Sequence, residues 1–233
     1  MTCDILVIAP HPDDAELHVG ASVARHIRMG ASVVVIDCSA GECASRGTVA
    51  ERAAEAQASA QIWGLQAREN LGLPDCGIDA SNPEQRQALS RALRRYAPGW
   101  VLAIAASAQH PDHCACHQLS RDAVKLASIH GYDRKLPAIA PPRLLFYEAE
   151  VPIMAQVLIP AQDADVACKQ ACLACYRSQW GPSSHGPQTG ISQPSFLEWI
   201  DNRGRSWGRQ IASPYAEAFT SLSPWPCPNL LQV

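Results

Sequence analysis

Two short segments of the sequence contain histidine and aspartate side chains of the types that bind zinc and transfer protons. Residues 11–14 are His-Pro-Asp-Asp, and residues 110–113 are His-Pro-Asp-His. Zinc in a hydrolase usually takes three protein ligands of imidazole and carboxylate type, and one position stays open for water. His11, Asp14 and His113 can supply those three ligands. The two segments therefore predict a catalytic zinc site.

Asp13 stands beside the predicted ligand Asp14 and is left to act as a general base. Zinc lowers the pKa of bound water from 15.7 to about 7, and a nearby carboxylate can take the proton that this water loses. A plainer interpretation is that Asp13 or Asp14 caps a helix and that residues 110–113 form a polar turn. Taken alone, each segment fits the capping or turn interpretation about as well as it fits a metal site. Both together, after two apolar strands, favour the metal site.

The elements before these segments explain how they can meet. Residues 5–9 and 100–106 are apolar runs of the kind expected for strands buried on both faces, and residues 32–36 form a third. Each histidine segment follows the carboxyl end of such a strand. Ligands of open α/β sheets bind beyond these ends. The sequence therefore predicts an active site at this edge of the sheet.

Strand and helix patterns alternate along the chain with short connections. This alternation predicts an α/β fold: a Rossmann-like open, mainly parallel sheet covered by helices on both faces. We expect one domain over residues 1–233, with an irregular tail at 222–233. The expected strands are 5–9, 32–36, 70–75, 100–106 and 143–147, and the expected helices are 15–29, 48–63, 83–96, 118–129 and 163–180.

The composition excludes several classes of protein. The 233 residues include 47% hydrophobic and 18% charged residues, with 19 Lys and Arg against 22 Asp and Glu. A net charge of −3 argues against a nucleic-acid partner bound through bulk charge. No apolar run approaches the length of a membrane helix, and no secretory signal precedes the first strand. We expect a cytoplasmic protein with no membrane partner.

Ten cysteines are unusually many for this length. Without a secretory signal, free thiols are favoured over disulfides. Cys114 and Cys116, which follow the predicted ligand His113, are expected to pack in the structure rather than to bind metal, and so is His18. A metal or thiol-redox protein built on the cysteines is one alternative. A nucleotide-binding α/β module is another, but no glycine phosphate loop follows a strand.

The two histidine segments resemble those of the PIG-L/LmbE family of zinc-dependent N-deacetylases. That family has a His-Pro-Asp-Asp motif near its N-terminus and a His-Pro-Asp-His motif farther on. The likeness continues through residues 41–42, 46–48, 51–52, 55, 70–75, 143–147, 169, 178–179 and 215–219. The later segments look most like the branch that deacetylates N-acetylglucosaminyl-malate in bacillithiol synthesis.

The resemblance implies roles for the residues of the two motifs. His11, Asp14 and His113 look like ligands of Zn²⁺, with Fe²⁺ as an alternative metal, and Asp13 looks like the general base. His110 looks like the group that polarises the amide carbonyl or stabilises the oxyanion, as an imidazolium. The same resemblance leaves open whether Asp13 or His110 protonates the leaving amine.

Further roles follow from the resemblance and from the proposed substrate. Asp112 is expected to hold a histidine in its useful tautomer. Arg52 and Arg143, and more weakly Arg46, stand at positions that resemble those of substrate-contacting arginines in the family. An arginine fork could bind the two carboxylates of malate. Exposed surface positions are the alternative for Arg52 and Arg143.

The resemblance also implies a small-molecule N-acetyl sugar as substrate and a homo-oligomer, a trimer or hexamer. Another acetylated sugar, such as a chitooligosaccharide or a secondary-metabolite intermediate, is the alternative substrate within the same reaction class.

Overall fold

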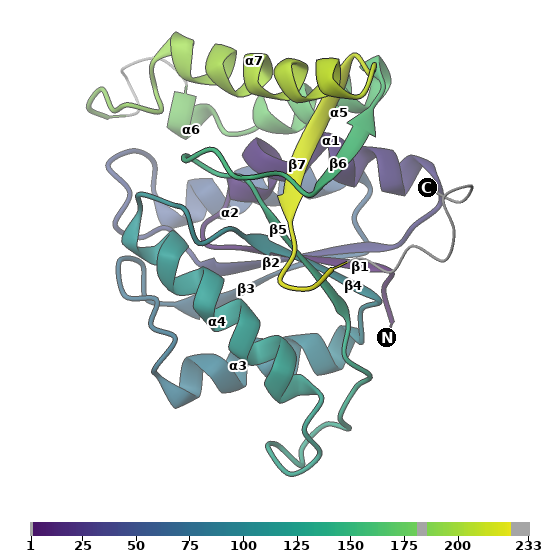
Figure 1. Cartoon of the computed structure of the whole chain (residues 1–233). Coiled ribbons are helices and arrows are strands. Elements are labelled where there is room, and N and C mark those ends of the chain that lie inside the picture. The colour runs from purple at the N-terminus through teal and green to yellow at the C-terminus, as the bar shows by residue number, and fades with distance from the viewer. Residues whose placement is uncertain (1, 181–185, 225–233) are drawn as a thin grey trace.

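A single sheet of seven strands forms the centre of the computed structural model, which describes residues 2–180 and 186–224 (Figure 1). The strand order is β3-β2-β1-β4-β5-β7-β6. The first five strands are parallel, and β7 runs antiparallel to both of its neighbours. The strands are β1 (Ile5–Ala9), β2 (Val33–Ser39), β3 (Ala67–Leu73), β4 (Trp100–Ile104), β5 (Arg143–Tyr147), β6 (Val157–Ala161) and β7 (Tyr215–Thr220).

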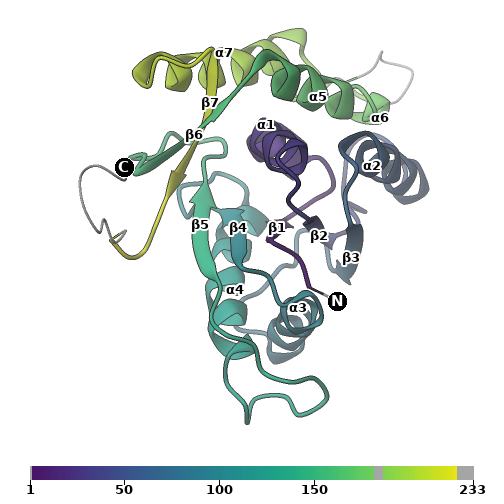
Figure 2. The same cartoon turned by 90° about the vertical axis from the view of Figure 1, so that its right-hand side faces the viewer.

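Helices cover both faces of this sheet (Figure 2). α3 (Pro83–Tyr96) and α4 (Pro111–Ala127) lie on one face. On the other face lie α1 (Asp14–Arg28), α2 (Val49–Trp63), α5 (Asp163–Leu173), α6 (Arg177–Trp180) and α7 (Pro194–Gln210). The predicted α/β class, with a mainly parallel sheet between two helical layers, is confirmed.

The order of the strands creates a crevice between β1 and β4. From β1 the chain proceeds through β2 to β3 on one side, whereas β4 and β5 extend the sheet on the other side. Crossover connections thus leave these two neighbouring strands in opposite directions, and such a switch point opens a crevice at their carboxyl ends. Residues 11–14 follow β1 and residues 110–113 follow β4, so both histidine segments border this crevice.

Several boundaries differ from the sequence prediction. α4 begins at Pro111, seven residues before the expected start, because His110 serves as its N-cap and accepts the Asp112 N–H through Nδ1 at 3.2 Å. His113 therefore lies in the first helical turn. The helix expected over 163–180 is interrupted after Leu173 and continues as α6. The strand expected at 70–75 runs from 67 to 73.

Three elements were not predicted at all: β6, α7 and β7. β6 contains Pro160 and is only partly buried along most of its length, so it lacks the apolar run of a central strand. α7 contains Gly204 and Gly208, which lower helix propensity. Gly204 is nevertheless required, because a Cβ there would lie 2.0 Å from the Tyr215 ring and would push α7 off β7. Most of the predicted irregular tail, residues 225–233, lies outside the described residues.

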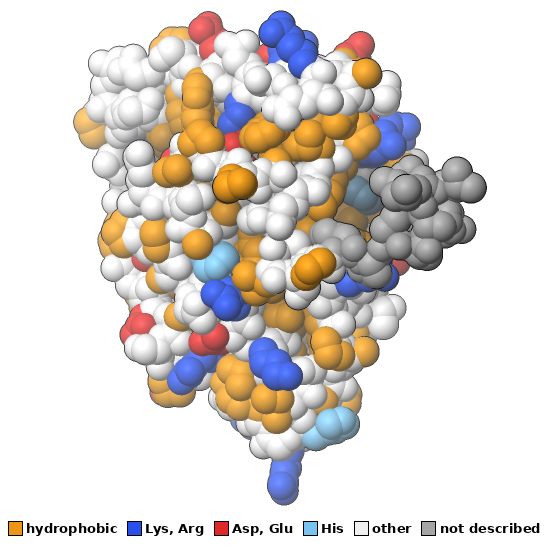
Figure 3. All heavy atoms as spheres, viewed as in Figure 1, with side chains coloured by type: hydrophobic (Ala, Val, Ile, Leu, Met, Phe, Trp, Pro, Cys, Tyr) orange, Lys and Arg blue, Asp and Glu red, His pale blue; other side chains and the backbone are white. Residues whose placement is uncertain are grey.

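Within the described ranges, no helix is both long and apolar enough to cross a membrane. On the face shown in Figure 3, Lys and Arg side chains lie scattered among polar and hydrophobic ones.

A buried ion pair supports a kink in α1, the helix that begins at Asp14. Val19 has non-helical angles, φ −132° and ψ 15°. The Glu217 carboxylate of β7 accepts the N–H groups of Ala21 and Ser22 at 3.1 and 2.7 Å, and Lys169 Nζ donates to the same carboxylate at 2.8 Å. The Glu217 carboxylate thus takes the place of backbone carbonyls as the acceptor for two N–H groups of the helix. A side chain inserted into the helix hydrogen bonds in this way is a known cause of kinks.

We expect Glu217→Ala to lower the free energy of unfolding by about 3–5 kcal/mol, because it leaves the Lys169 ammonium buried without its partner. Urea unfolding followed by circular dichroism measures this change. The exposed Arg205–Asp201 pair offers a matched control, and Asp201→Ala is expected to change stability by no more than about 1 kcal/mol. Equal effects of the two variants would contradict the bracing role of Glu217.

Candidate active site

The structure brings together the three predicted metal ligands. Asp14 Oδ2 lies 3.3 Å from His11 Nδ1 and 3.3 Å from His113 Nε2. Two ligands of tetrahedral zinc with bonds of about 2.0 Å lie about 3.3 Å apart, so both contacts match the edge of a zinc coordination tetrahedron. The chemistry of this donor set, two imidazoles and one carboxylate, fits a catalytic zinc ion.

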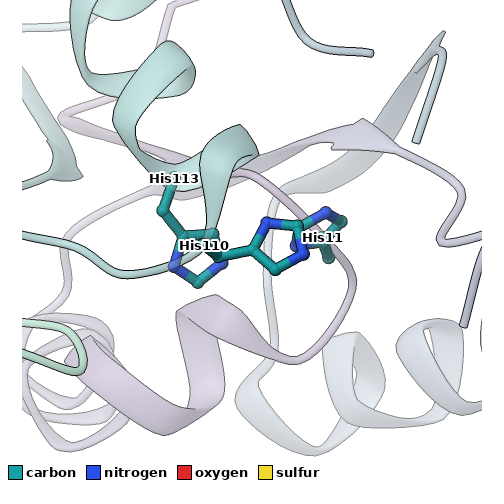
Figure 4. A group of neighbouring side chains, drawn as sticks. All are labelled: His11, His110 and His113. Carbon is teal, nitrogen blue, oxygen red and sulfur yellow. The ribbon is translucent and has the colours of Figure 1, made fainter. Parts of the chain in front are cut away.

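His110 joins the same cluster from the cap of α4 (Figure 4). One ring nitrogen each of His11, His110 and His113 lies within 4.8 Å of the others, so these three could also hold a metal. His110 Nδ1 accepts the backbone N–H of Asp112, which leaves Nε2 as its other polar atom. His11, Asp75 and Asp112 form a second such group among the described residues, and neither group includes Asp14. The contacts of Asp14 Oδ2 with His11 and His113 are the observation in favour of a set that contains Asp14.

Carboxylates lie at the far nitrogens of both histidines that were predicted as ligands. His11 Nε2 is 3.1 Å from Asp75 Oδ1 and 3.1 Å from Asp112 Oδ2. His113 Nδ1 is 2.6 Å from Glu150 Oε1. A carboxylate at the far nitrogen fixes the tautomer of a metal-binding histidine and orients its ring. His11 Nδ1 and His113 Nε2 are thereby the atoms that face Asp14.

The sequence predicted such a contact for Asp112 but not for Asp75 or Glu150. Glu150 comes three residues after β5, the kind of strand end that already pointed to the two histidine segments. Asp75 follows β3 in a turn and could have been found by the same rule.

Asp13 is buried beside the ligands in a strained conformation. Its φ is 110°, and its carboxylate lies in contact with Arg52 Nη2 at 3.1 Å. Arg52 also donates to the carbonyl of Pro12. Burial raises the pKa of Asp13 to about 7, with Arg52 opposing the rise and Asp14 adding to it. A carboxyl with a pKa near neutrality can both accept a proton and return it.

These residues line a cavity of about 650 Å³ whose lining combines polar and apolar side chains. The polar part includes the histidines, Asp13, Asp14, Asp75 and Glu150. The apolar part includes Leu17, Ile191, Phe196 and Trp199, mostly from α7 and the loop before it. Trp199 is 41% exposed, a large apolar surface for a residue inside a pocket.

The three predicted substrate arginines occupy different places. Arg52 and Arg46 line the cavity, but Arg52 pairs with Asp13 and Arg46 donates to the carbonyls of Ser178 and Pro187 at 2.9 and 3.4 Å. Arg143 does not reach the site, and this part of the prediction was wrong. It is the first residue of β5, so it lies at the opposite end of the parallel strands, where its guanidinium is 5.2 Å from the Trp100 ring.

Several known proteins are similar to this chain in sequence and in fold. The conserved protein TT1542 from Thermus thermophilus is 35% identical with a TM-score of 0.88, and the match covers 97% of each chain. A 1D-myo-inositol 2-acetamido-2-deoxy-alpha-D-glucopyranoside deacetylase from Thermobispora bispora is 24% identical over 157 residues, which cover 53% of this chain and 52% of that protein. The chain thus spans about half the length of this curated deacetylase.

The fold also serves other chemistry. GalB, the 4-carboxy-2-hydroxymuconate hydratase from Pseudomonas putida KT2440, has a TM-score of 0.78 at 22% identity, with 99% of this chain and 100% of that chain covered. The fold alone therefore does not determine the reaction.

A family model matches the first half of the chain. The model described as "PIG-L: GlcNAc-PI de-N-acetylase" matches residues 6–124, just over half of the chain, and this range contains β1, β4 and both histidine segments. With the cluster that those segments form, this match shows that the chain belongs to the PIG-L family of deacetylases.

Proposed function

We propose that the protein is a zinc-dependent amide hydrolase that removes the acetyl group from an N-acetylglucosaminide. The observation that supports this most strongly is the position of Asp14 Oδ2, 3.3 Å from nitrogens of both His11 and His113, with the buried Asp13 next in sequence. Family membership supports the reaction type. The metal and its ligand set are our proposal.

A divalent metal, when bound by these three residues, supplies Lewis acidity that lowers the pKa of water and polarises a carbonyl. Asp13 is placed to take the proton from the attacking water, because Arg52 holds one of its carboxylate oxygens and burial brings its pKa to about 7. The same carboxyl can then give the proton to the leaving amine, which requires no second acid.

His110 is placed to donate a hydrogen bond to the developing oxyanion. Burial, and then His11 and His113, lower the pKa of His110 below its usual value. Its Nδ1 accepts a backbone N–H, so the neutral ring has its proton on Nε2. We therefore replace the imidazolium suggested by the sequence with a neutral N–H donor. Such a donor typically contributes about 10² to 10³ in rate.

The charged and aromatic residues of the cavity bear on the aglycone, the group to which the sugar is attached. The malate glycoside of bacillithiol synthesis requires cations for two carboxylates, but Arg52 and Arg46 are engaged with protein groups and Arg143 lies at the far end of the sheet. Glu150 adds a carboxylate to the cavity, while Phe196 and Trp199 offer aromatic rings. These features favour a neutral aglycone with an apolar face, as in the alternative of another acetylated sugar.

We expect Asp13→Asn to lose at least about 10²-fold in kcat, because the amide cannot accept the proton, while zinc stays bound. Acetate release and the zinc content of the dialysed protein measure the two properties. Asp201→Asn, a substitution of the same kind at a partly exposed position of α7, is the control. Full turnover in Asp13→Asn would remove Asp13 as the base.

A substrate panel tests the aglycone. We expect a phenyl N-acetylglucosaminide to have a lower KM than N-acetylglucosaminyl-malate, and Trp199→Ala to raise the KM for the phenyl compound by about tenfold, equivalent to 1.4 kcal/mol. Trp199→Phe keeps an aromatic ring and is expected to retain most of the preference. A preference for the malate glycoside that Trp199→Ala leaves unchanged would restore the bacillithiol interpretation.

A further inference from the structure

His18 is a buried histidine next to the candidate metal site that the mechanism above does not use. It lies on α1, four residues after Asp14, and only 5% of its surface is exposed. Its ring stacks on Tyr147, with ring centroids 6.0 Å apart and an interplanar angle of 19°. The Tyr147 hydroxyl in turn donates to the carbonyl of Ile8 at 2.9 Å. Packing on Tyr147 would explain why a ring lies at this position, but it would not explain the polar contacts of the two ring nitrogens.

Arg203 of α7 determines which nitrogen of His18 carries the proton. Arg203 Nη2 lies 3.1 Å from His18 Nδ1. A guanidinium has donors and no acceptor, so Nδ1 must accept. The ring is then neutral, and its one proton sits on Nε2.

Nε2 faces the metal-ligand residue. It lies 3.7 Å from Asp14 Oδ1, while the other carboxylate oxygen, Oδ2, faces His11 and His113. This distance exceeds that of a hydrogen bond, so the contact is an electrostatic attraction between the N–H and the carboxylate. In a buried site such an attraction acts with little screening by water.

Arg203 is itself held on several sides. Arg203 Nε is 3.4 Å from Glu148 Oε2, Arg203 Nη1 donates to the carbonyl of Ala149, and the guanidinium carbon lies 4.9 Å from the Trp199 ring. Trp207 Nε1 also donates to Glu148 at 2.7 Å. The guanidinium therefore has a fixed place from which it can direct His18.

We propose that His18 and Arg203 are positioning residues for Asp14. Arg203 fixes the His18 tautomer, and the His18 N–H directs Oδ1 of Asp14 so that Oδ2 stays toward His11 and His113. This inference rests on the proposed metal site. It assigns a role in that site to α7, which lies outside residues 6–124 of the family match.

Zinc affinity, measured by competition with a chelating dye, tests the proposal. His18→Phe keeps a ring over Tyr147 but removes both nitrogens, and Arg203→Met removes the donor that fixes the tautomer. We expect each to weaken zinc binding by about 10- to 100-fold, the usual range for groups that orient a metal ligand. His18→Gln has an amide oxygen for Arg203 and an amide N–H for Asp14, so it is expected to bind within about threefold of the unaltered protein.

The control is His26→Phe, the same substitution on the same helix, at a histidine whose Nδ1 contacts the carbonyl of Ser22. It is expected to leave zinc affinity unchanged. Absorption spectra of the Co²⁺-loaded proteins provide a second readout, and the ligand-field bands are expected to shift in His18→Phe but not in His26→Phe. Thermal unfolding verifies that each variant folds, and Arg203→Met provides the test if His18→Phe does not.

Asp14→Ala separates failure of this inference from failure of the proposed function. If Asp14→Ala loses zinc while His18→Phe and Arg203→Met bind it normally, the positioning role is wrong and the metal site stands. Equal loss in His18→Phe and His18→Gln, with no recovery by the amide, would also overturn the role. If Asp14→Ala retains zinc, both the metal site and this inference are wrong.

Discussion

One carboxylate, that of Asp14, is the constraint around which the site is arranged. Its Oδ2 lies 3.3 Å from nitrogens of two histidines that are about a hundred residues apart in the chain. A buried carboxylate is costly unless charges and donors compensate it. Here the backbone N–H of His11 donates to Oδ2 at 2.9 Å, and His18 faces Oδ1. The order of the strands meets this need, because β1 and β4 lie side by side and the chain leaves both of them at the same edge.

Elements from the C-terminal part of the chain contact α1 and stabilise this arrangement. Glu217 of β7 caps the second half of the kinked helix α1, and Lys169 of α5 neutralises that carboxylate. Arg203 of α7 contacts His18 on the same helix. The part of α1 that follows Asp14 is thus held at residues 18, 21 and 22 by side chains distant in sequence. α7 lies so close to β7 that only glycine fits at position 204.

The sequence allowed prediction of the parts that depend on local pattern. Buried apolar runs located β1, β4 and β5, and the two histidine segments after strands led to His11, Asp14 and His113. Arg143 was misplaced, because it is the first residue of the expected strand 143–147 and so lies at the end of a parallel strand opposite the site. Glu150 and Asp75 also follow strand ends, but each is a single carboxylate with no histidine beside it, so only its position after a strand could have indicated it. α7 was missed because Gly204 and Gly208 lower its helix propensity. The single domain, the cytoplasmic location and the trimer or hexamer stay predictions.

The most direct test of the account is X-ray absorption spectroscopy at the zinc edge of the metal-loaded protein. The account predicts nitrogen and oxygen ligands at about 2.0–2.1 Å, with imidazole scattering that fits two histidines. His110→Ala is expected to leave this spectrum unchanged, and Asp14→Ala to alter it. Sulfur at about 2.3 Å would place the metal on cysteines instead. Three imidazoles that become two in His110→Ala would show that His110, and not Asp14, completes the ligand set.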